Sequence, residues 1–162
     1  MQKITPFLWF DNNAEEALRF YTAVFKEAQQ GEMVRYGDAV PALKGQVLTA
    51  TLTLFGQQFI LLNGGPKFRF TEAVSFVVNC ETQEEVDYYW NKLSEGGEES
   101  MCGWLKDRFG LSWQVVPTAL VRLLNDKDSA KANRVMQAML QMNKIDIAAL
   151  EKAAEGEKIA VA

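Results

Sequence analysis

Residues 73–90 read AVSFVVNCETQEEVDYYW, and this stretch predicts a β-strand followed by an α-helix. The apolar, β-branched run over residues 73–79 is typical of a buried strand. Residues 82–85 form a capping-box pattern, in which a threonine hydroxyl accepts a hydrogen bond from a free N–H of the first helical turn. Gly96 and Gly97 are expected to end the helix. The apolar face of this helix consists of Val86, Tyr89, Trp90 and Leu93.

A second copy of this layout lies 69 residues earlier in the chain. The apolar run over residues 4–10 predicts a buried strand, and the polar residues after it end that strand. We expect the Asn13 side chain to cap the following helix, with acidic residues at the positive end of the helix dipole. The matched pairs are Asn13 with Thr82, Glu15 with Glu84, Glu16 with Glu85, Phe20 with Tyr89 and Tyr21 with Trp90.

Each predicted helix is followed by hairpin-like sequence. Residues 47–55 alternate and residues 59–62 return, whereas in the second half residues 101–106 are expected to pair with residues 111–116. Each half therefore reads as a strand, a helix and about three strands. This order predicts an α+β fold of two βαβββ modules, about residues 3–66 and 72–117, in one domain over residues 1–117. An ordinary α+β sheet whose motifs match by chance is the alternative.

A C-terminal helical arm is predicted over residues 118–162. Residues 118–124 read as a short helix, Ser129 is placed to cap a second one, and Asp146 is placed to cap a third that ends at Gly156. Because so short an arm has little interior of its own, we expect its methionine stripe to pack on the main sheet or on a second subunit. A cofactor or peptide site is the alternative role for this stripe, which consists of Met136, Met139 and Met142.

Composition excludes several classes of function. The chain has 162 residues, a net charge of −4 and no histidine. The negative charge argues against a nucleic-acid partner, and no apolar run approaches the roughly 18 residues that span a membrane. The lack of histidine excludes Ser-His-Asp and Cys-His nucleophiles and every zinc site that needs histidine.

Cysteine usage favours a reducing, cytoplasmic location. Cys80 and Cys102 are too few for a disulfide framework, and the first residues lack the layout of a signal peptide. We expect both thiols to be buried and free, and a disulfide between them is the alternative.

Residues 103–114, GWLKDRFGLSWQ, resemble a sequence block of the PhnB-like family, as do residues 6–11 (PFLWFD), residues 14–17 (AEEA) and the pair Phe20-Tyr21. This family is often labelled 3-demethylubiquinone-9 3-methyltransferase-like and is a branch of the vicinal oxygen chelate (glyoxalase/bleomycin-resistance) superfamily. The resemblance covers residues 3–117. It implies that the two modules form a curved mixed sheet around a cavity, in a homodimer.

The resemblance also indicates where the metal ligands of the superfamily would lie. The matching positions are near Pro6, near Leu61, among residues 73–75 and at Gln114. A divalent cation needs carboxylates, imidazoles or thiolates, and one neutral amide does not replace them. We therefore expect no metal site. The glycines never form the G-x-G-x-x-G pattern of a dinucleotide site, so we also expect no cofactor and find no support for a methyltransferase.

The candidate ligand contacts follow from the expected cavity face. Strand alternation puts Ser112 and Gln114 on one face, opposite Trp113, and the superfamily pattern makes it the inner face. Gln114 is the first choice because a buried amide must find partners. Trp104 is the candidate aromatic wall, with core packing as the alternative. The full set is Gln114, Trp104, Ser112, Ser75, Leu8 and Cys102, where Cys102 is either a reactive thiol or, as we expect, an inert one.

Other conspicuous residues are expected to be structural. Trp90 is expected to pack beneath its helix. Asp107 and Arg108 are expected to serve the turn. The solvated carboxylates are expected to be Glu72, Glu81, Glu98 and Glu99.

The predicted function is binding of a small organic molecule in a cavity without a metal. The alternatives are a metal-independent enzyme acting on a small metabolite and a dimeric interaction scaffold. We expect a cytoplasmic homodimer with a small-molecule ligand and with neither a nucleic-acid nor a membrane partner.

Overall fold

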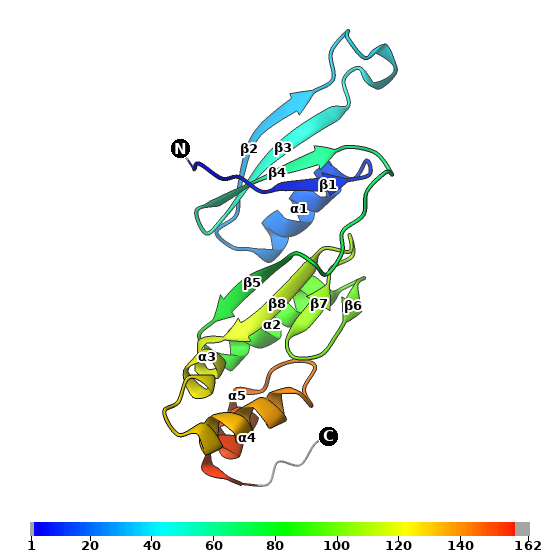
Figure 1. Cartoon of the computed structure of the whole chain (residues 1–162). Helices are drawn as coiled ribbons and strands as arrows, with labels where there is room; N and C mark the ends of the chain where they lie inside the picture. The colour runs from blue at the N-terminus through cyan, green and yellow to red at the C-terminus, as the bar shows by residue number, and fades with distance from the viewer. Residues whose placement is uncertain (1, 158–162) are drawn as a thin grey trace. The chain divides into compact units, whose positions relative to one another are not determined.

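The computed structural model describes residues 2–157. The chain divides into two compact units, residues 1–70 and residues 71–162 (Figure 1). Each unit contains one βαβββ module, and the second also contains the C-terminal helices. The predicted α+β class and the helical extension are therefore confirmed. Among residues 2–157, no helix is both long and apolar enough to cross a membrane.

The first unit is a four-stranded sheet with one long helix. Its sheet has the order β1-β4-β3-β2, in which β1 is parallel to β4. Alternate strand residues are buried, and α1 packs on the sheet with its own buried face (Figure 1). The elements are β1 (Phe7–Phe10), α1 (Ala14–Val24), β2 (Gln29–Arg35), a 3-10 helix (Pro41–Leu43), β3 (Val47–Leu54) and β4 (Gln57–Asn63).

The second unit repeats this topology. Its sheet has the order β5-β8-β7-β6, in which β5 is parallel to β8, so each strand occupies the place of its counterpart in the first sheet. This equivalence confirms the predicted duplication. Helix α2 buries Val86, Trp90 and Leu93, so Trp90 packs beneath its helix as predicted. The elements are β5 (Ser75–Cys80), α2 (Gln83–Ser94), β6 (Glu98–Glu99), β7 (Trp104–Lys106) and β8 (Ser112–Pro117).

The repeat has one offset for the helices and another for the strands. The N-caps Asn13 and Thr82 lie 69 residues apart, as predicted, but the strands before them end at Phe10 and Cys80, which lie 70 apart. Both strands also begin later than expected, at Phe7 and Ser75. The two offsets differ because the first turn contains one more residue than the second. The side chains of a strand alternate between the two faces of its sheet. If the two modules are aligned on their helices, this one extra residue therefore matches inward-facing positions of one strand with outward-facing positions of the other.

The cap of α1 differs from the prediction. The Asn13 side chain makes no capping hydrogen bond. Instead, Asn63 at the end of β4 accepts a hydrogen bond from the Ala14 N–H at 2.9 Å and donates one to the Val47 carbonyl at 3.0 Å. A buried residue 49 positions away thus takes the role expected of the local one. The cap of α2 is confirmed, since the Thr82 hydroxyl accepts from the Glu85 N–H at 3.3 Å.

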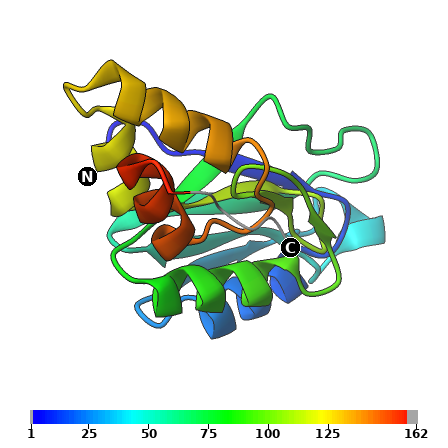
Figure 2. The same cartoon turned by 90° about the horizontal axis from the view of Figure 1, so that it is seen from below.

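The arm consists of α3 (Thr118–Leu124), α4 (Ser129–Met139) and α5 (Ile147–Glu155), which lie together at one end of the second unit (Figures 1 and 2). Asp146 and Gly156 cap α5 as predicted. However, Asp128 caps α4 in place of Ser129, because its carboxylate accepts from two N–H groups of the first turn. The arm also has a small core of its own, formed by Leu120, Leu123, Val135, Ile145, Leu150 and Ala154.

The methionine stripe only partly joins that core. Met139 and Met142 pack against it, whereas Met136 is 40% exposed. Packing is therefore the role of two of the three methionines of the stripe.

The arm docks on the second module of its own chain through residues 142–147, here called the docking segment. The Cys102 and Gly103 N–H groups donate to the carbonyls of Met142 and Asn143, each at 2.7 Å. The Gln83 side chain donates to the Ile145 carbonyl at 3.1 Å and accepts from the Ile147 N–H at 2.9 Å. Lys144 forms an ion pair with Asp87 at 2.7 Å. The module and the arm are thus joined by backbone hydrogen bonds beside β7.

Candidate functional site

The β7–β8 hairpin is organised by a buried carboxylate. Asp107 is 2% exposed and lies in the turn between the two strands. Its oxygens accept hydrogen bonds from the N–H groups of Phe109 at 2.9 Å and Leu111 at 3.1 Å, and from the indole of Trp113 at 2.9 Å. Asp107 therefore shapes the turn, in agreement with its expected structural role. Arg108 pairs with Glu95 at 3.6 Å outside the turn.

The residues before β7 adopt left-handed backbone geometry. Cys102 has a φ of 59° and Gly103 a φ of 81°. A Cβ atom on Gly103 would lie 2.7 Å from the Val115 carbonyl oxygen, so a glycine is required where the backbone passes so close to β8. The Val115 N–H in turn donates to the Gly103 carbonyl at 2.8 Å. This close contact between the Gly103 and Val115 backbones fixes the position of the neighbouring Trp104.

The two faces of the second sheet differ in chemistry. One face is apolar and buried, and contains Val78, Cys80, Leu105, Trp113 and Val115. The strand register places a polar row across the opposite face, formed by Glu98, Lys106, Ser112 and Ser75 on four successive strands. The next row on that face consists of Trp104, Gln114 and Val77. Polar groups and one indole ring are thus neighbours on the same surface.

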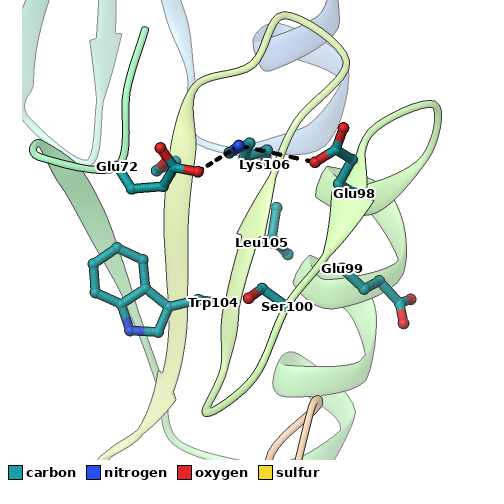
Figure 3. A pocket seen from close by; sticks show the side chains of 8 residues that line it. Glu72, Glu98, Glu99, Ser100, Trp104, Leu105 and Lys106 are labelled. Atoms are coloured by element: carbon teal, nitrogen blue, oxygen red, sulfur yellow. Dashed lines mark ion pairs between the residues drawn. The ribbon is translucent and has the colours of Figure 1, made fainter.

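A pocket of about 200 Å³ lies on this polar face (Figure 3). The Lys106 side chain lies between Glu72 and Glu98 and pairs with both, the latter at 3.8 Å. The hydrogen bond between Lys106 and Glu72 raises the pKa of the lysine and lowers the pKa of the glutamate. Both groups therefore stay charged near neutral pH. The pocket is lined by Glu72, Glu98, Glu99, Ser100, Trp104, Leu105, Lys106 and Ser112.

Ser112 contributes an unusual group to the pocket. The residue is 1% exposed, and among residues 2–157 its hydroxyl is the one buried side-chain oxygen or nitrogen without a hydrogen-bond partner. Buried hydroxyls almost always have a partner, because leaving one unpaired costs about 1–3 kcal/mol. A ligand that offers a polar atom to this hydroxyl would recover that free energy.

Two of the six sequence-predicted contacts, Trp104 and Ser112, line the pocket. Gln114 occupies the register position beside Trp104, and its side chain donates to the Ser75 hydroxyl at 2.9 Å. Neither Gln114 nor Ser75 is a lining residue.

The other two candidates lie elsewhere. Leu8 belongs to the first unit, is 6% exposed and pairs with Leu61 in the parallel register. Cys102 is half-buried next to the docking segment, and both it and Cys80 are free thiols.

Sequence reasoning missed Lys106 and its two carboxylate partners as site residues. A signal was present, because Trp104 and Lys106 are two residues apart on a strand and therefore share a face. Glu72 and Glu98 are exposed, as expected of solvated carboxylates, with side-chain exposures of 59% and 78%. Their pairing with one lysine could not be predicted because residue 72 precedes the strand and residue 98 lies on a two-residue strand.

The positions that correspond to metal ligands in the superfamily do not fit a divalent cation. Leu61 is apolar and fully buried. Gln114 and Ser75 are neutral and hydrogen-bonded to each other. Within the described range 2–157, no group of three or more histidine, cysteine, aspartate or glutamate side chains could hold a metal ion. Hard cations require several anionic oxygens, and this donor set does not supply them.

Comparisons with known proteins agree with the fold. The family model described as 3-demethylubiquinone-9 3-methyltransferase matches residues 2–116. The structure of the PhnB protein from Bacillus cereus is 40% identical, with a TM-score of 0.66, over 72% of this chain and 100% of that one. No curated protein is similar enough to count as a relative.

Two more distant structures share the fold alone. Protein PA1353 from Pseudomonas aeruginosa is 24% identical, with a TM-score of 0.61, over 72% of this chain and 98% of that one. The fosfomycin resistance protein FosX from Listeria monocytogenes is 15% identical, with a TM-score of 0.54, over 77% of this chain and 98% of that one. The family match ends before α3, so the arm lies beyond it.

Proposed function

Since the chain belongs to the PhnB-like, 3-demethylubiquinone-9 3-methyltransferase family of the vicinal oxygen chelate superfamily, we propose that it binds a small organic molecule, without a metal ion, on the polar face of its second sheet. The ligand site is the pocket lined by Trp104, Lys106 and Ser112. A pocket of about 200 Å³ suits a molecule below drug size.

The observation that carries this proposal is the unpaired hydroxyl of Ser112. If packing were the only role of residue 112, an alanine would serve as well as a serine at this fully buried position. The serine instead keeps a polar atom beside an indole ring and an ammonium group. Ligand sites combine such an apolar wall with a few convergent polar groups.

The charges in the pocket support binding in preference to acid–base catalysis. Lys106 has a raised pKa and remains an ammonium, so it does not serve as a base near neutral pH. Glu72 has a lowered pKa and remains a carboxylate, so it does not serve as an acid. Because Glu72 and Glu98 both pair with Lys106, they are also poorly placed to chelate a metal ion together.

NMR signals of the backbone and indole N–H groups test the proposal directly. We would titrate the isotope-labelled chain with a library of small aromatic and apolar metabolites and follow the indole N–H signals. A ligand is expected to shift the signal of Trp104. The signal of Trp113 is an internal control, because its N–H group is bonded to Asp107, which does not line the pocket. A shift confined to the control, or stoichiometric metal in the purified protein, would contradict the proposal.

We further propose that the protein is a cytoplasmic homodimer. Support for the location comes from the two free thiols, Cys80 and Cys102. Support for the dimer comes from β2, an edge strand of the first sheet in which all seven residues are exposed. Exposed edges of this kind pair readily with a second chain. Light scattering of the purified chain should give twice the monomer mass, and a Val34→Lys variant on β2 should shift it toward the monomer.

A further inference from the structure

We infer that the pocket on the second sheet selects a small organic cation, in which a flat apolar group carries an ammonium. This inference rests on the proposed function and adds the charge of the ligand to it.

The balance of charge in the pocket disfavours an anion. Among the eight lining residues, three are glutamates and one is a lysine. The Lys106 ammonium is engaged by Glu72 on one side and by Glu98 at 3.8 Å on the other. An anionic ligand would have to displace one of these carboxylates and would then face the remaining ones. The excess of negative charge instead attracts a cation.

Glu98 is the carboxylate best placed to receive the ammonium of a ligand. Glu72 pairs more closely with Lys106 than Glu98 does. Glu99 points away from the ion pairs in Figure 3 and accepts a hydrogen bond from the Trp90 indole at 2.9 Å. The loosely held carboxylate of Glu98 therefore has most acceptor capacity left for a new donor.

Two further groups define the rest of the ligand. The Trp104 indole lines the pocket and offers a face to a flat apolar group or to the cation itself. The Ser112 hydroxyl is a buried, unpartnered group of a lining residue, and it accepts from the ammonium N–H or donates to a polar atom of the ligand. A cluster of carboxylates alone would only concentrate counterions. In this pocket the buried Ser112 hydroxyl also offers the ligand a hydrogen bond of defined direction.

A charge series of similar shape provides the test. We would measure binding of benzylamine, benzyl alcohol and benzoate to the full chain by titration calorimetry at low and high salt. Benzylamine is expected to bind about two- to five-fold more tightly than benzyl alcohol, since the carboxylates are exposed and screened, and benzoate is expected to bind most weakly. High salt should reduce the preference for benzylamine.

Two variants assign the preference to the pocket. Glu98→Gln should bring the affinities of benzylamine and benzyl alcohol together, whereas Glu95→Gln, which alters the glutamate paired with Arg108 outside the pocket, should leave the ratio unchanged. If benzyl alcohol or benzoate bound best, the cation inference would be overturned while the proposed function stood. If none of the three bound at millimolar concentration, the cation inference would be overturned, and the Trp104 signal in the metabolite titration would decide the proposed function separately.

Discussion

The carboxylate of Asp107 and the indole of Trp113 are joined by a hydrogen bond of 2.9 Å across the β7–β8 hairpin. The same carboxylate accepts from the N–H groups of Phe109 and Leu111. Three donors thus converge on one buried anion, and the strands that carry Lys106 and Ser112 are held in register by it. The polar face of the pocket depends on a carboxylate that lies outside the pocket.

Replacing this carboxylate should destabilise the fold. Asp107→Asn turns one acceptor oxygen into an N–H₂ group that faces a donor, and it removes the charge from the remaining hydrogen bonds. We expect a loss of about 2–3 kcal/mol in the free energy of unfolding, measured with urea. Asp38→Asn, which alters an exposed ion pair with Lys44, is the control and should change little. Equal effects of the two variants would show that Asp107 does not organise the hairpin.

Gln83 is predicted to hold the arm against the module. Gln83→Ala removes both hydrogen bonds to the docking segment, which should cost about 1–2 kcal/mol. Amide hydrogen exchange at Cys102 and Gly103 should become faster, because these N–H groups donate to the same segment. Asn91→Ala, on the exposed side of α2, is the matched control. Unchanged exchange at the two amides would mean that the segment stays docked without Gln83.

Two neighbouring serines should respond to alanine in opposite directions. Ser112→Ala removes an unpaired buried hydroxyl, so the ligand-free protein should gain up to about 1 kcal/mol of stability while its affinity for a bound amine falls. Ser75→Ala, at the adjacent register position, removes the acceptor of the Gln114 amide and should cost about 1 kcal/mol. Thermal and urea unfolding measure both effects. A destabilised Ser112→Ala protein would indicate a structural serine.

The buried thiol of Cys80 should make stability depend on pH in the alkaline range. Burial, followed by the nearby charges of Glu85 and Glu81, raises the pKa of Cys80 from 9.0 to about 12. In the unfolded chain the thiol ionises above about pH 9, whereas in the folded protein it stays neutral until about pH 12. Stability from this group is therefore complete below pH 9 and declines as the pH rises toward 12.

Urea unfolding at a series of alkaline pH values measures this decline. A Cys80→Ala variant lacks the thiol and should show a shallower decline, whatever its stability at neutral pH. Parallel curves for the two proteins would rule out the thiol as the source.

The duplicated fold could be predicted because its signals are local. The capping threonine at residue 82, the glutamates in the first turn of each helix and the buried Tyr21 and Trp90 repeat at one spacing, and each reports on its own helix. The cap of α1 could not be predicted in the same way. It is supplied by Asn63, whose position depends on the pairing of β1 with β4 and not on any neighbour in sequence.

The pocket was only half predictable for a related reason. Alternation along β8 correctly separates Ser112 from Trp113 and leads to Ser112, whereas Trp104 is selected for its place after Gly103 and beside the turn. Lys106 becomes a site residue only because β6 and the residues before β5 bring Glu98 and Glu72 to it, and β6 is too short to leave a periodic pattern. Long-range ion pairs of exposed side chains have no signature in a single sequence.

A crystal structure of the chain with benzylamine tests the central claim most directly. The account predicts a bound molecule whose ring contacts Trp104 and whose nitrogen lies within hydrogen-bond distance of the Ser112 hydroxyl or the Glu98 carboxylate. A pocket filled by the protein's own side chains, with Ser112 paired to one of them, would contradict it.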